Sequence, residues 1–154
     1  LREQGYSALE VDAVLALRPR LLSDIPPRLA AVRAFAALPE APALAAANKR
    51  IGNILKKAGD VDPHVSTVLL QDAAEVALHQ AMQQVVQLAD RQFEDGDYAA
   101  SLQTLAALRG PVDAFFDGVM VNAQEMDIRL NRQGLLKVLH LAMNRVADLS
   151  RLAN

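Results

Sequence analysis

LAAANKRIGNILKKAG, residues 44–59, has the apolar periodicity of an amphipathic α-helix. Its apolar residues recur at spacings of three and four and would form one buried stripe: Ile51, Ile54, Leu55 and Ala58. Cationic and amide side chains collect on the opposite side: Lys49, Asn53, Lys56 and Lys57. Because asparagine is a mediocre helix former, its place among these cations needs an explanation. We therefore ask what such a face would bind.

Helix signals recur along the rest of the chain, and strand signals do not. Ser7 and Glu10 form a capping box, and Asp24 and Asp97 are candidate N-caps. We expect helices at about 7–18, 24–38, 43–59, 71–93, 97–110, 111–121 and 126–152, with Gly59, Gly96 and Gly110 as helix stops. Because most loops are short, the predicted fold is an all-α antiparallel bundle of about seven helices.

Length and composition favour a single globular domain. The chain has 154 residues, 52% of them hydrophobic, and a mean hydropathy of +0.11. It has no apolar run long enough to span a membrane and no signal-peptide pattern, so no membrane partner is expected. The absence of cysteine excludes disulfides and thiolate metal sites and is compatible with the cytosol. Since the chain does not begin with Met, we expect residues 1–154 to be a domain of a longer polypeptide.

Charge is distributed unevenly along the chain. The net charge of −2 argues against a protein that coats nucleic acid nonspecifically. Residues 47–59 nevertheless carry four basic and no acidic residues, whereas residues 60–125 carry two basic and eleven acidic ones. Residues 126–154 are basic again, with five bases and two acids. If the two basic stretches meet in space, they form a modest basic surface; otherwise they are two solvated helix faces.

The basic face of residues 44–59 has the chemistry needed to bind RNA. Mobile lysines can contact phosphates, and the amide of Asn53 offers the paired donor and acceptor that an unstacked base requires. The alternative is an exposed lysine-rich face on which Asn53 bonds to a neighbouring loop.

The last predicted helix carries a second set of such groups. Arg129, Asn131 and Arg132 place two guanidinium groups and an amide within one turn. A guanidinium can pair with phosphate or stack on a base. The alternative is an ion pair inside the protein with an acid just upstream: Asp113, Asp117, Glu125 or Asp127.

Nothing in the sequence indicates an active site. Asp72, Glu75 and His79 share one helix face, but acidic helix surfaces commonly look like this, and we predict no metal site. No glycine-rich phosphate loop is present. We therefore predict no catalytic residue and no cofactor in this chain.

Two long motifs are LAAANKRIGNILKKAG (44–59) and PVDAFFDGVMVNAQEMDIRLNRQGLLKVLHLAMNRVADLSRL (111–152). Together they resemble the C-terminal anticodon-binding domain of bacterial glycyl-tRNA synthetase beta subunits. The family's pattern matches around residues 47–50, 53–55, 113–117, 129 and 131–132. The sequence departs from the family at Asn122, Gln124 and Gly134, and glycine inside a helix should cost about 1 kcal/mol relative to alanine.

The resemblance implies an all-helical module that holds the anticodon arm of a glycine tRNA. It implies a cytoplasmic enzyme that joins glycine to tRNA with ATP and Mg, built as a heterotetramer with a catalytic alpha subunit, and no DNA partner. The residues predicted to bind RNA are Asn48, Lys49, Arg50, Asn53, Lys56, Lys57, Arg129, Asn131 and Arg132.

Two other classes of function remain open on the residues alone. One is a helical protein-interaction module that docks a partner subunit through its apolar and alanine-rich surface. The other is a bundle that binds a metal ion or another ligand.

Overall fold

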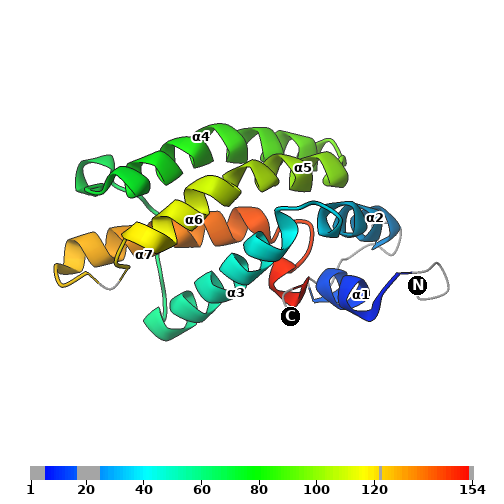
Figure 1. Ribbon diagram of the computed structural model, residues 1–154, viewed down its shortest axis with the longest axis horizontal. Coiled ribbons are helices and arrows are strands. Elements are labelled where there is room, and N and C mark those ends of the chain that lie inside the picture. Colours follow the sequence, from blue (N-terminus) through cyan, green and yellow to red (C-terminus); the bar gives the residue numbers. More distant parts are fainter. Residues whose placement is uncertain (1–5, 17–24, 122, 153–154) are drawn as a thin grey trace.

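The computed structural model describes residues 6–16, 25–121 and 123–152, and it is all-helical over them (Figure 1). No residue in these ranges lies in a strand. The prediction of an all-α bundle of about seven helices is therefore confirmed. The helices are α1 (Ala8–Leu15), α2 (Ile25–Ala36), α3 (Ala41–Ala58), α4 (Ala73–Glu94), α5 (Tyr98–Leu105), α6 (Arg109–Gly118) and α7 (Met126–Met143).

The long helix α7 runs through the middle of the molecule, with α4 on one side of it and α3 on the other (Figure 1). α4 also packs against α5 and α6, and α2 packs against α5. The core between them is built from fully buried aliphatic and aromatic side chains, among them Leu78, Leu102, Phe115, Leu135 and Leu139. This packing leaves one side of α3 open to solvent.

The apolar stripe of α3 faces this core, with one exception. Ile51 and Leu55 are buried and Ile54 is half-buried, as the periodicity predicts. Ala58 was expected in the same stripe but is exposed. It is the last residue of α3, and residues 56–60 are all exposed because this final turn runs past the core.

Local capping explains several helix ends. The Ser7–Glu10 capping box opens α1, and the Asp97 side chain accepts the backbone N–H of Ala100 at the start of α5. Gly59 and Gly96 have positive φ, at 86° and 81°. Glycine adopts this backbone conformation after a helix with little strain because it has no Cβ. The predicted helix end at Arg18 and the N-cap Asp24 lie outside the described residues.

Two helix boundaries differ from the prediction. Gly110 does not end a helix, because the chain continues through the 3₁₀-helix η4 (Ala106–Leu108) into α6, where Pro111 occupies the first turn and its missing N–H is not needed. α7 ends at Met143 instead of near Leu152. There Asn144 donates to the carbonyl of His140 (2.8 Å) and accepts the N–H of Leu149 (3.0 Å), which turns the chain into the 3₁₀-helix η5 (Leu149–Leu152).

Among the described residues, no single helix is long and apolar enough to cross a membrane. α2 and α3 meet the length and composition criteria only as a pair, and that pair is bent by 111°.

Candidate RNA-binding surface

The open side of α3 forms a ridge of basic and amide side chains. At 100° per residue, Asn53 lies on the crest, Lys49 and Lys56 on one flank, and Arg50 and Lys57 on the other. All five are exposed, as predicted for the lysines and for Asn53. None of the three lysines forms an ion pair with a residue that the structure describes. The ridge therefore presents mobile, unpaired positive charge.

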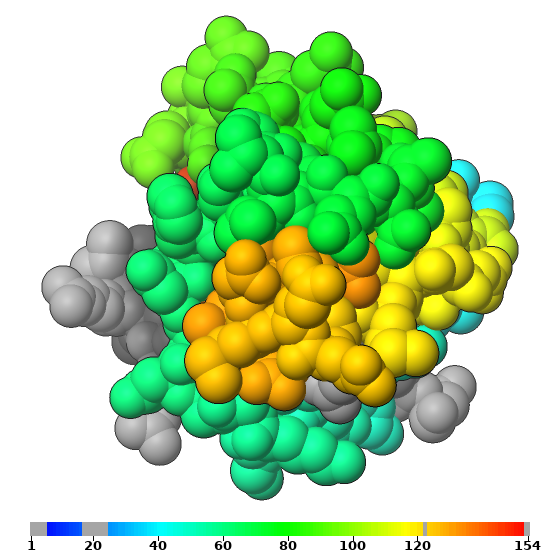
Figure 2. Space-filling model, turned by 90° about the vertical axis from the view of Figure 1, so that its left-hand side faces the viewer, coloured from blue at the N-terminus to red at the C-terminus, as the bar shows by residue number. Residues whose placement is uncertain are grey.

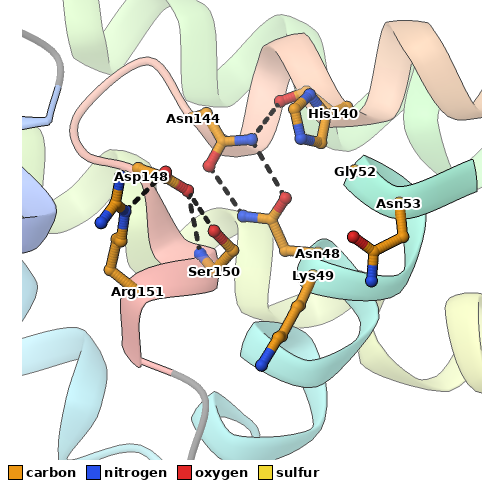
Figure 3. Close-up of a pocket in the computed structure, with 9 residues that line it drawn as sticks. All are labelled: Asn48, Lys49, Gly52, Asn53, His140, Asn144, Asp148, Ser150 and Arg151. Atoms are coloured by element: carbon orange, nitrogen blue, oxygen red, sulfur yellow. Dashed lines mark hydrogen bonds and ion pairs between the residues drawn. The ribbon is translucent and has the colours of Figure 1, made fainter. Parts of the chain in front are cut away.

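A hollow of about 650 Å³ lies on the first flank of the ridge, between α3 and the end of α7 together with η5 (Figure 3). Its lining is polar and comes from three segments: Asn48, Lys49, Gly52, Asn53, His140, Asn144, Asp148, Ser150 and Arg151. We call it the η5 hollow. It brings the two basic stretches of the sequence together, as the charge pattern allowed.

The inner wall of the η5 hollow is a reciprocal amide pair. Asn48 donates to Asn144 at 2.7 Å, and Asn144 donates back to Asn48 at 3.0 Å (Figure 3). Asn48 has no exposed surface. The prediction that Asn48 contacts RNA is therefore corrected. Its amide is buried and hydrogen-bonded to Asn144, and this pair holds α3 against the end of α7.

His140 projects into the same hollow from the last turn of α7 and is half-buried. Burial lowers the pKa of its imidazole below the usual 6.5, and Lys137 adds to this effect while Asp148 opposes it. The ring is therefore neutral at neutral pH and offers one donor and one acceptor.

The far side of the η5 hollow is organised around Asp148. Its carboxylate accepts the Ser150 hydroxyl at 2.6 Å and pairs with Arg151 at 3.4 Å. Arg151 also pairs with Asp12 on α1 at 3.2 Å. The sequence prediction did not single out His140, Asn144, Ser150 or Arg151, because it continued the last helix through them; the only signal was the excess of basic residues after position 126.

A second hollow, of about 470 Å³, lies on the other flank of the ridge, between α3 and α6. Its lining is Ala43, Ala46, Ala47, Arg50, Asp113, Phe116 and Asp117. The guanidinium carbon of Arg50 lies 4.3 Å from the centre of the Phe116 ring. We call this the α6 hollow. α3 therefore stands as a ridge between two hollows.

The predicted RNA-binding groups on α7 are mostly inside the protein. Arg132 is only 5% exposed and pairs with Glu75 (3.3 Å) and Asp72 (3.1 Å) on the α4 side, while also donating to the carbonyl of Met120 (2.6 Å). These partners differ from the upstream acids considered as the alternative. Asn131 is also buried. We therefore correct the assignment of Arg132 and Asn131 to the RNA-binding surface, because internal partners occupy both side chains.

Asn131 fastens the segment between α3 and α4 onto α7. It accepts the N–H of Ser66 at 2.6 Å and donates to the carbonyl of Ser66 at 3.1 Å. A Cβ added at Gly134 would overlap the carbonyl oxygen of His64 and lie 3.0 Å from that of Asp62. This close approach explains the glycine. Of the other two departures from the family pattern, Gln124 is exposed and Asn122 lies outside the described residues.

Arg129 is the remaining predicted residue on α7. It is half-buried and forms no ion pair with a residue in the described ranges, the four upstream acids included. Asp72 and Glu75 cap the first turn of α4 as well as pairing with Arg132. Within the described residues, no group of three or more histidine or acidic side chains is arranged to hold a metal ion.

Comparison with protein families assigns this arrangement of helices to a known class. The model of the DALR anticodon binding domain matches residues 44–149, from α3 to the start of η5. The chain therefore belongs to the family of DALR anticodon-binding domains.

The chain is similar over 99% of its length to proteins named glycine–tRNA ligase beta subunit. It is 76% identical to that of Polaromonas naphthalenivorans (strain CJ2), 72% to that of Paracidovorax citrulli (strain AAC00-1) and 71% to that of Acidovorax sp. (strain JS42). The chain spans 21–22% of the length of these relatives.

Proposed function

We propose that this chain is the anticodon-binding domain of a glycine–tRNA ligase beta subunit, and that the ridge of α3 binds the anticodon arm of a glycine tRNA. The observation that carries the proposal is the row of exposed, unpaired cations around Asn53 on α3, inside the segment that matches the anticodon-binding family. An RNA loop needs positive charge to neutralise its phosphates and polar side chains to meet its bases.

The contribution of this domain to the whole enzyme is binding rather than chemistry. In our proposal, the longer beta subunit assembles with a catalytic alpha subunit into a heterotetramer in the cytoplasm, and that enzyme uses ATP and Mg to charge the tRNA. Residues 1–154 form one domain of it, hold no cofactor and supply contacts to the anticodon arm.

The ridge divides the work between two kinds of contact. Lys49, Lys56 and Lys57 reach phosphates, where they set the position of the arm without reading its sequence. Asn53 stands on the crest and offers its amide to a base edge. The η5 hollow beside it adds a neutral imidazole from His140 and the guanidinium of Arg151.

Salt-dependent binding of the whole enzyme to glycine tRNA tests this proposal. Lys56→Ala and Lys57→Ala should weaken binding and reduce the slope of log Kd against log salt by about 1 each, because each phosphate contact releases counterions. Arg91→Ala is the matched control, since Arg91 is an exposed cation on α4, across the molecule from α3. Unchanged affinity and slope in both lysine variants would contradict the proposal.

Asn53→Ala separates base contacts from phosphate contacts. If Asn53 makes a bidentate base contact, this variant should lose about 1–3 kcal/mol of discrimination in favour of the cognate anticodon. The salt dependence of binding should be unchanged. Aminoacylation of glycine tRNA and of an anticodon-swapped variant measures the discrimination. Equal losses on both tRNAs would assign Asn53 to the backbone instead.

A different observation favours a second function, docking to another protein. Figure 2 looks onto the first turns of α7, in orange. Exposed apolar side chains lie on these turns, on the short helix at residues 67–69 that packs against α7, and after α6: Met126, Leu130, Val68 and Met120. Leu130 lines a hollow together with Asp60, Asp62 and Asp127, which would repel phosphate. This end suits a partner subunit rather than RNA, and it leaves the ridge of α3 free.

A further inference from the structure

The α6 hollow has chemistry that differs from that of the rest of the ridge. The guanidinium carbon of Arg50 lies over the ring of Phe116, 4.3 Å from its centre, which makes a cation–π contact. Arg50 is nevertheless exposed, and it forms no ion pair with a residue in the described ranges. A planar cation that rests on an aromatic ring and remains accessible is a stacking platform.

Two carboxylates flank this platform. Asp113 pairs weakly with Arg109 at 3.5 Å on the exposed surface of α6, and Asp117 forms no ion pair with any residue that the structure describes. Carboxylates only accept hydrogen bonds and repel phosphate. The α6 hollow is therefore unsuited to an RNA backbone, although its platform suits a base.

We propose that the α6 hollow holds one unstacked base of the bound RNA. The base stacks on the guanidinium of Arg50 and donates its amino group to Asp117 or Asp113. The inference rests on the proposed function, since the lysines of α3 must first bring the RNA to the ridge. Its volume of about 470 Å³ falls in the range of small-molecule sites, about 300–1,000 Å³.

The carboxylates define which bases fit. Asp and Glu side chains accept from the amino group of cytosine in nucleic-acid complexes. Uracil has a carbonyl oxygen where cytosine has its amino group, so two hydrogen-bond acceptors would face each other at the carboxylates. The site therefore selects a base that carries an amino group over uracil.

Binding of the whole enzyme to glycine tRNAs tests the site. Arg50→Lys keeps the positive charge but removes the planar guanidinium, and Phe116→Leu removes the aromatic ring beneath that guanidinium. Each should weaken binding roughly 5- to 150-fold, the range for loss of one base–aromatic stack, and should leave the salt slope nearly unchanged. Thermal unfolding checks that Phe116→Leu, whose side chain is half-buried, is folded.

The carboxylates are tested on tRNAs in which each anticodon-loop base is replaced in turn by uracil. Wild-type enzyme should lose affinity at one position, and the combined Asp113→Asn and Asp117→Asn variant should lose this discrimination. Asp95→Asn, at an exposed position after α4, is the control and should retain it. Both aspartates of the α6 hollow are exposed, so the combined variant should fold.

The outcomes separate this site from the proposed function. Weaker binding by the lysine variants, together with normal binding by Arg50→Lys and Phe116→Leu, would overturn the α6 site and leave the function standing. Discrimination retained by the combined aspartate variant would also overturn it. If wild-type enzyme ignores the anticodon arm altogether, both proposals fail.

Discussion

Two asparagines that lie 96 residues apart join the end of α7 to the middle of α3. Each satisfies the other, and Asn144 also caps the C-terminus of α7. If one amide is removed, the other stays buried without a hydrogen-bond partner, and its desolvation is no longer compensated. At the scale of the residue, this pair therefore matters to stability more than any exposed cation of the ridge.

Removing either amide should destabilise the protein. Asn48→Ala and Asn144→Ala should each lower the free energy of unfolding by about 1–3 kcal/mol, and the double variant by less than their sum because the two groups interact. Urea denaturation measures all three. Asn53→Ala, on the exposed crest, should change it by about 0.5 kcal/mol or less. Additive effects would show that the pair is not coupled.

His140 should make stability depend on pH. Burial lowers its folded-state pKa below 6.5, so the unfolded chain binds a proton more readily. The free energy of unfolding should therefore fall as the pH drops through 6.5 toward the folded-state pKa. His140→Gln should flatten that part of the profile, which chemical denaturation between about pH 7.5 and about pH 5.5 would reveal. An unchanged profile would argue against the lowered pKa.

At the scale of the element, α7 is shaped by the segment that crosses it. The backbone of residues 62–66 lies directly on α7 at Gly134 and is bonded there by Asn131. Figure 2 shows the first turns of α7, in orange, facing the viewer, with the green atoms of α4 above them and the yellow atoms around the end of α6 beside them. The glycine that weakens α7 as an isolated helix is thus required by packing.

Two glycines inside helices should respond to alanine in opposite ways. Gly134→Ala should destabilise the fold, although alanine favours a helix by about 1 kcal/mol, because the new Cβ would overlap the carbonyl of His64. Gly52→Ala on α3 should be neutral or stabilising, since its Cβ would only reach ordinary contact with His140 at 3.5 Å. Thermal unfolding of both variants decides this. A Gly134→Ala variant more stable than the wild type would mean that the backbone of residues 62–66 moves away to make room for the new Cβ.

At the scale of the whole molecule, Arg132 ties three separate parts together. From α7 it reaches Glu75 and Asp72 at the start of α4 and the carbonyl of Met120 after α6. Glu75 has no exposed surface, so Arg132 offsets the cost of burying its carboxylate. The arginine therefore serves the assembly of the bundle, and its family-like sequence context does not make it an RNA contact.

Arg132→Ala should lower the free energy of unfolding by about 3–5 kcal/mol, because it leaves the carboxylate of Glu75 buried and unpaired. Arg132→Ala with Glu75→Gln should recover part of this loss, since no buried charge remains. Arg129→Ala is the control on the same helix. A folded Arg132→Ala protein of normal stability that fails only to bind tRNA would return Arg132 to the RNA-binding surface.

The sequence by itself determined the helices and the face of α3. These are local properties: the Ser7–Glu10 capping box, the glycines at positions 59 and 96 and the spacing of Ile51 and Leu55 act within one or two turns. The exposure of the ridge lysines follows from the same periodicity. The motifs of residues 44–59 and 111–152 also carried the family resemblance.

Only the tertiary structure decided which polar side chains are left to bind RNA. In the sequence, Asn48, Asn131 and Arg132 cannot be told apart from the polar residues that are exposed. Their hydrogen-bond partners lie 96, 65 and 57 residues away along the chain. The same holds for the end of α7, where Asn144 bonds across to Asn48 and turns the chain. Helical periodicity cannot report these contacts, because a buried polar group is defined by the distant group that satisfies it.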